Sequence, residues 1–104
     1  MSNKEAEVQR WVRENIEKAF EGYVYAFKVP QGQYTSRRGI PDLVFSIHGR
    51  FVAIEVKSVG GSLTKLQQFE IDKICKAYGR AFVIYGKDAS TLKAIIEAIK
   101  NDCL

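Results

Sequence analysis

The pattern of hydrophobic and polar positions along the chain predicts three helices and four strands. Residues 4–21 carry apolar side chains every three or four positions, which is the period of an amphipathic helix, and Gly22 follows as a stop signal. These apolar side chains are Val8, Trp11, Val12, Ile16, Ala19 and Phe20. The same period predicts a helix over residues 63–78 and a last helix, capped by Asp88 or Ser90, that extends to about residue 100.

Four other segments are rich in aromatic and β-branched residues, as strands are. They are residues 23–29, 42–47, 51–57 and 81–85. A polar connection at His48 and Gly49 joins the second and third as a hairpin. The third is apolar on both faces, which is typical of a central strand, and the fourth is a continuous apolar run suited to an interior strand.

A helix lies between the third and fourth predicted strands, which favours a crossover to a parallel strand. The expected order is therefore α-β-β-β-α-β-α, an α/β fold. With 104 residues, the chain has room for one domain, residues 1–104, and not for two.

Three charged residues gather near one end of the apolar hairpin. Because strand side chains alternate between faces, Glu55 and Lys57 project from the same side. Asp42 begins the partner strand directly after Pro41, which cannot donate to a strand ladder. A buried Glu or Lys is destabilising unless it is paired or bound to a metal. A plain Glu–Lys pair at an exposed strand end is the structural alternative.

Two polar residues in the first turns of predicted helices lie along the apolar stripes of those helices. Glu5 has this position in the first helix and Gln67 in the second. A structural explanation exists for each. Glu5 places a favourable charge at the positive end of a helix, and Gln67 can form a capping box with Thr64.

The carboxylates suggest a metal site. Hard cations such as Mg²⁺ take oxygen ligands, and Asp42, Glu55 and the carbonyl of Val56 can supply them. A bound cation acidifies water and screens phosphate charge during phosphodiester hydrolysis. Glu5 could hold a second cation or a water molecule bound to the first.

Other polar residues suit contact with a phosphate. Lys57 could orient the attacking water or neutralise the developing charge, and the Gln67 amide could position the water or a phosphate. Arg37, Arg38 and Lys65 are the candidates for contact with a nucleic-acid backbone. Solvated surface arginines are the alternative for the first two.

Composition narrows the class of protein. A net charge of +4 and a pI near 9.1 favour a polyanionic partner. The single histidine excludes a Ser-His-Asp triad, and no G-x-x-x-x-G-K phosphate loop is present. Cys75 and Cys103 lack metal-site spacing. Cys75 is expected on a helix and Cys103 in a frayed tail, which favours reduced thiols in a cytoplasmic compartment over a disulfide. No apolar run is long enough for a bilayer, and no signal-peptide pattern opens the sequence.

Several short motifs resemble those of a known family. Pro41-Asp42 followed by Glu55-Val56-Lys57 is similar to the PD-(D/E)xK signature of restriction-endonuclease-like nucleases. Residues 39–43 (GIPDL), residues 63–67 (LTKLQ) and the early run EAEVQ, residues 5–9, resemble more narrowly the virus-type replication-repair nuclease domain, VRR-NUC. The likeness covers nearly the whole chain.

This resemblance implies a restriction-endonuclease-like α/β core with a central mixed sheet, and hydrolysis of DNA phosphodiester bonds that depends on Mg²⁺ or Mn²⁺. Asp42 and Glu55 would be metal ligands and Lys57 the catalytic lysine, while Glu5 and Gln67 match further family positions. Small stand-alone members of the phage or bacterial type resemble Holliday-junction resolvases, DNA-repair enzymes that act as homodimers.

Three alternatives stay open from the sequence. The same chemistry could act on flaps, nicks or ordinary duplex DNA. The fold could be a non-catalytic module that binds nucleic acid, although the intact Asp42, Glu55 and Lys57 count against a decayed site. An unrelated α/β domain would leave the aligned positions of Glu5 and Gln67 unexplained.

Overall fold

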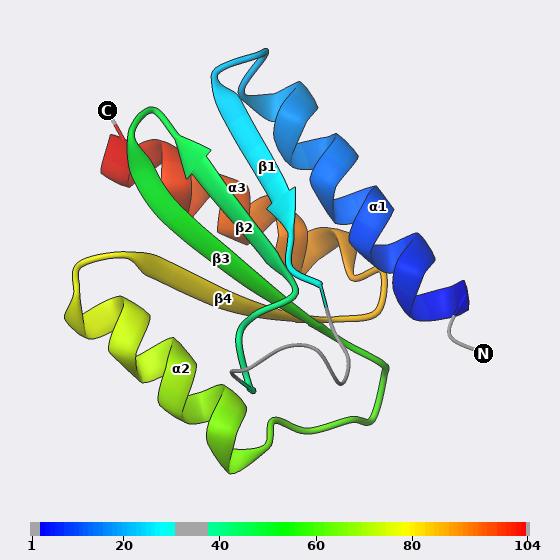
Figure 1. Cartoon of the computed structure of the whole chain (residues 1–104). Helices are drawn as coiled ribbons and strands as arrows, with labels where there is room; N and C mark the ends of the chain where they lie inside the picture. The colour runs from blue at the N-terminus through cyan, green and yellow to red at the C-terminus, as the bar shows by residue number, and fades with distance from the viewer. Residues whose placement is uncertain (1–2, 31–37, 104) are drawn as a thin grey trace.

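The structure, a computed structural model, describes residues 3–30 and 38–103 and has the predicted α/β architecture (Figure 1). Its elements are α1 (Asn3–Ala19), β1 (Val24–Lys28), β2 (Leu43–Ile47), β3 (Arg50–Lys57), α2 (Lys65–Lys76), β4 (Arg80–Tyr85) and α3 (Ala89–Cys103). The predicted order is confirmed, and the boundaries differ by at most three residues. Within the described residues, no helix has the length and apolar character needed to cross a membrane.

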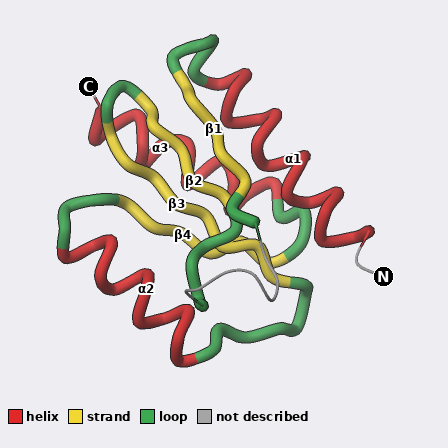
Figure 2. The backbone as a smooth tube through the Cα atoms, viewed as in Figure 1, coloured by secondary structure: helices red, strands yellow, loops and turns green. Residues whose placement is uncertain are grey.

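The four strands form one mixed sheet in the order β1-β2-β3-β4 (Figure 2). β1 and β2 are antiparallel, as are β2 and β3, whereas β3 and β4 are parallel. The turn between β2 and β3 has positive φ at both His48 and Gly49, the conformation that matches the twist of a hairpin. The predicted hairpin and the predicted parallel strand are therefore both confirmed.

One expectation about the sheet is wrong: β4 lies at its edge and not in its interior. Its apolar character has a different cause. Both α2 and α3 pack against β4, so the two faces of this edge strand are covered although one side of its ladder has no strand.

The main core lies between the sheet and the pair α1 and α3, while α2 covers the opposite face (Figure 1). Alternate residues of β3, namely Val52, Ile54 and Val56, point into this core. The intervening residues of β3 therefore face α2, and among them are Glu55 and Lys57. The alternation of the strand thus brings two charged side chains against the first turn of α2.

Helix caps fix where α2 and α3 begin. Thr64 and Gln67 form the predicted capping box. The backbone amide of Gln67 donates to Thr64 Oγ1 at 3.1 Å, and the backbone amide of Thr64 donates to Gln67 Oε1 at 2.9 Å. Asp88, not Ser90, caps α3, because its Oδ1 accepts from the Thr91 amide at 3.1 Å. Ser90 lies inside the helix and its hydroxyl also donates to Asp88.

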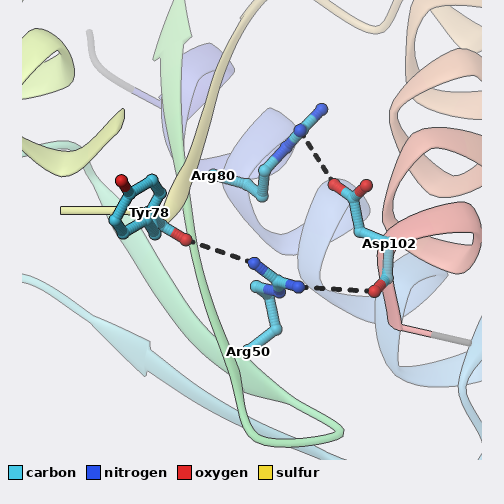
Figure 3. Close-up of polar contacts among 4 residues, drawn as sticks. All are labelled: Arg50, Tyr78, Arg80 and Asp102. Carbon is cyan, nitrogen blue, oxygen red and sulfur yellow. Dashed lines mark hydrogen bonds and ion pairs between the residues drawn. The ribbon is translucent and has the colours of Figure 1, made fainter. Parts of the chain in front are cut away.

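A polar cluster joins three elements at the end of β3 that is remote from Glu55 (Figure 3). The Arg50 guanidinium donates to the carbonyl oxygens of Tyr78 and Asp102, at 3.2 and 3.4 Å. The Asp102 carboxylate forms an ion pair with Arg80 at 2.9 Å. The start of β3, the turn before β4 and the end of α3 are thereby held together.

The segment before β2 packs directly on the backbone of α2 through Gly39. This residue has a φ of +84°, and a Cβ placed on it would lie 2.6 Å from the carbonyl carbon and the carbonyl oxygen of Leu66 and 3.0 Å from the Gln67 nitrogen. No side chain fits there unless one of the two backbones shifts. Gly39 therefore sets the distance between Asp42 and the first turn of α2.

Gly39→Ala is expected to lower the free energy of unfolding by about 2–4 kcal/mol, because a left-handed conformation and a backbone clash are combined at this position. Gly60→Ala is a matched control. Gly60 has a similar φ of +87° but no heavy atom within 4 Å of an added Cβ, so only the conformational strain of about 1–2 kcal/mol remains. Urea unfolding of both variants measures the difference; equal losses would contradict the proposed close approach.

Candidate active site

Two buried carboxylates lie opposite each other at one end of the β2–β3 pair. Leu43 pairs with Ile54, so continuing this antiparallel register places Asp42 opposite Glu55. Asp42 is 8% exposed and Glu55 is 3% exposed. Asp42 Oδ2 accepts a hydrogen bond from the Val56 amide at 2.9 Å, and this bond fixes the carboxylate against β3.

Gln67 connects Glu55 and Lys57 to the start of α2. Its Nε2 donates to Glu55 Oε2 at 3.0 Å, and its Oε1 accepts from Lys57 Nζ at 3.2 Å. The same Oε1 accepts from the Thr64 amide in the capping box. The two explanations of Gln67 considered from the sequence therefore hold together, since one side chain caps the helix and contacts both charged groups.

The electrostatics favour the neutral form of the carboxyl groups. Burial, and after it the neighbouring charge of Asp42, raise the pKa of Glu55 from its ordinary value of 4.5 to about 7, against the opposing effect of Lys57. Burial also raises the pKa of Asp42, while the hydrogen bond from the Val56 amide opposes this shift. Perturbed pairs of this kind are characteristic of functional sites.

Glu5 lies in the first turn of α1, as predicted, with an exposed side chain. Its negative charge contributes to raising the pKa of both Asp42 and Glu55, so it lies near enough to act on the pair. In the part of the chain that the structure describes, no three His, Cys, Asp or Glu side chains are grouped closely enough to hold a metal ion. Glu5 is therefore not brought into one ligand set with the two buried carboxylates.

The buried pair nevertheless fits a divalent cation. Glu55 Oε1 is buried and, among the described residues, has no hydrogen-bond partner. A buried polar atom of this kind is unfavourable unless something binds it. Hard cations bind carboxylate oxygens and would also relieve the repulsion between Asp42 and Glu55.

Of the residues predicted to contact nucleic acid, Arg38 and Lys65 have exposed side chains. Arg38 adjoins Gly39, which packs on the first turn of α2, and Lys65 is the first residue of that helix. These two cations therefore lie at the same helix end as Gln67. Arg37 lies outside the described residues.

Gln9 has no role in the sequence-based interpretation, yet it is only 8% exposed and its Oε1 lacks a hydrogen-bond partner within the described residues. Its neighbours Val8 and Val12 belong to the buried stripe of α1. The position of a polar residue beside such a stripe is the feature of the sequence that could have indicated the burial of Gln9. The resemblance of residues 5–9 to a known family implies a role for Glu5 and not for Gln9.

The raised pKa of Glu55 predicts that the metal-free protein becomes less stable as the pH rises. The folded protein binds the proton more tightly than the unfolded chain, so the contribution is full below pH 4.5 and is lost as the pH rises through about 7. Glu55→Gln removes this group but keeps an oxygen that can accept from Gln67.

The stability of Glu55→Gln relative to the unsubstituted protein should therefore increase by about 1–3 kcal/mol between about pH 5 and pH 8. Urea unfolding in the presence of EDTA measures this difference. If it is the same at both pH values, the carboxyl of Glu55 titrates normally and the account of its burial is wrong.

Comparison with known proteins agrees with the geometry. Residues 3–88 match the VRR-NUC domain family. A solved structure of a VRR_NUC domain is 25% identical, with a TM-score of 0.71, and the match covers 90% of this chain and 95% of that one.

A more distant match is Hjc from Archaeoglobus fulgidus, described as a Holliday junction resolvase. It is 19% identical, with a TM-score of 0.48, over 71% of this chain and 63% of that one. No curated protein sequence matches this chain. Because the family match spans most of its length, the chain belongs to the VRR-NUC domain family of nucleases.

Proposed function

We propose that this nuclease is a metal-dependent endonuclease that cuts structured DNA, and that it resolves four-way junctions as a homodimer. The buried pair of Asp42 and Glu55, with its unpartnered oxygen and a lysine linked to it through Gln67, is the observation that carries the proposal. An ordinary exposed Glu–Lys pair would leave no carboxylate oxygen buried without a partner.

Mg²⁺ or Mn²⁺ would be held by Asp42, Glu55 and the carbonyl oxygen of Val56, and would supply water activation and screening of phosphate charge. Glu5, whose charge acts on both carboxylates, would hold a second cation or a water molecule bound to the first. The exposed position of Glu5 suits a contact made through water.

Lys57 is proposed to stabilise the charge that develops on the phosphate oxygens during hydrolysis. An ammonium group has three donors, and the bond to Gln67 occupies one of them. Gln67 therefore orients the ammonium and leaves two hydrogens for the substrate. Since Gln67 also caps α2, this orientation depends on the position of the helix.

DNA is the proposed substrate because the chain carries a net charge of +4 and has exposed cations near the carboxylates. Arg38 and Lys65 are proposed to contact backbone phosphates beside the cut. Arg37 is assigned the same role from the sequence alone. Contacts of this kind fix the position of the DNA but do not read its sequence.

A homodimer would bring two such sites to the two opposed strands of a junction. An exposed apolar surface supports this part of the proposal. It consists of side chains between 46% and 73% exposed on the sheet face that α2 partly covers and on α2 itself: Tyr25, Phe27, Phe51, Leu66 and Phe69. Apolar surface of this kind is typical of an interface between proteins.

Lys57→Ala is expected to lower the rate of junction cleavage at least about a hundredfold, because the charge stabilisation in the transition state is lost. Binding of the junction should stay within about threefold, since one phosphate contact contributes little of the total affinity. The assay uses a labelled four-way junction, a flap and a linear duplex, each with Mg²⁺, Mn²⁺ or EDTA.

Lys93→Ala is the matched control, because Lys93 is an exposed lysine of α3 and takes no part in the site. It should cleave at the rate of the unsubstituted protein. Paired nicks in opposed strands of the junction support the full proposal. Preferential cutting of the flap or duplex would show that the junction is not the preferred substrate. Binding without cleavage in any metal would show that the domain is a non-catalytic module.

A further inference from the structure

We infer that a groove between α1 and the end of β1 binds the phosphate backbone of the DNA strand next to the site of cleavage. The groove has a volume of about 440 Å³, and the residues of its lining that matter here are Glu7, Gln9, Arg10, Arg13, Lys28 and Leu43. The inference rests on the proposed function, since it assigns a second contact region to the same substrate. We call this region the α1 groove.

The α1 groove has an excess of positive charge. Arg10, Arg13 and Lys28 line it, and Glu7 offsets only one of these three charges. Arg10 and Arg13 are three residues apart on one helix, which separates them by about 4.5 Å along the axis. Guanidinium groups present several donors in a plane and are well suited to phosphate oxygens.

Two polar atoms in the α1 groove are buried and lack hydrogen-bond partners within the described residues: Gln9 Oε1 and Arg13 Nε. Gln9 is more than nine-tenths buried, and Arg13 lies one turn further along the same face. A phosphate would accept from Arg13, and a water molecule held by that phosphate would donate to Gln9. The structural alternative is that these two unpartnered atoms bond to each other after a rotation of one side chain, without any contact to DNA.

The position of the α1 groove connects it with the carboxylate pair. Leu43 directly follows Asp42 and pairs with Lys28 across the β1–β2 ladder. Gln9 lies one helical turn after Glu5, whose charge acts on Asp42 and Glu55. The first half of α1 runs beside the end of β1 (Figure 1). A strand that leaves the carboxylates over this sheet end would therefore pass along the α1 groove.

The test compares two triple variants that each remove three positive charges. The groove variant combines Arg10→Gln, Arg13→Gln and Lys28→Gln. The control combines Lys76→Gln, Lys93→Gln and Lys100→Gln, which change exposed lysines of α2 and α3 away from the groove. Junction binding is measured by fluorescence anisotropy in EDTA over a range of NaCl concentrations, with circular dichroism to check folding.

The groove variant should bind at least about tenfold more weakly, and the slope of log affinity against log salt should fall by about two or three units. The control should keep the original slope within about half a unit. Equal slopes in the two variants, whether both unchanged or both reduced, would overturn the assignment of the α1 groove. Metal-dependent cleavage by the unsubstituted protein would still stand in that case, so the two proposals fail separately.

Gln9→Leu tests the uncharged part of the α1 groove. If Gln9 acts on bound DNA, the affinity should fall about threefold or more while the salt slope stays unchanged, because no charge is removed. If Gln9 serves only to pair with Arg13, Gln9→Leu will bind DNA as the unsubstituted protein does. That result would remove Gln9 from the proposed contact.

Discussion

The structure depends on the burial of two carboxyl groups, Asp42 and Glu55, side by side at one end of a strand pair. Burial raises the pKa of both groups, and the charge of Asp42 adds to the shift of Glu55, whose pKa reaches about 7. Removing an ion from water is unfavourable by several kcal/mol, so the fold must compensate locally. The backbone amide of Val56 donates a hydrogen bond to Asp42, and the side-chain amide of Gln67 donates one to Glu55. The other oxygen of Glu55, Oε1, has no hydrogen-bond partner within the described residues.

This constraint explains the residue types found at positions of the chain that are distant in sequence from the two carboxyl groups. Gln67 reaches Glu55 only because α2 begins at the capping box and lies against the backbone of Gly39. Lys57 is held through the same amide, so one side chain couples the helix position to both charged groups. At the remote end, the Arg50 guanidinium donates to the Asp102 carbonyl oxygen and so links β3 to α3.

The sequence was sufficient for the element order, the hairpin and the convergence of Asp42, Glu55 and Lys57, because strand alternation and turn chemistry are local rules. It was misleading for β4, since an apolar run reports covered faces and not whether a neighbouring strand is present. The dual role of Gln67 was only partly predictable, because its contacts depend on tertiary packing. The burial of Gln9 and its neighbourhood with Lys28 depend on how α1 lies against β1, which no local pattern encodes.

We propose that the buried pair is a cation site, and calorimetric titration of Mn²⁺ into the protein tests this most directly. A carboxyl with a pKa of about 7 is about half protonated at neutral pH, so binding should release about half a proton per site. Titrations in buffers of different ionisation enthalpy measure this number. Glu55→Gln should bind at least about tenfold more weakly and release no proton from this position. Equal affinity and equal proton release in the two proteins would contradict the account.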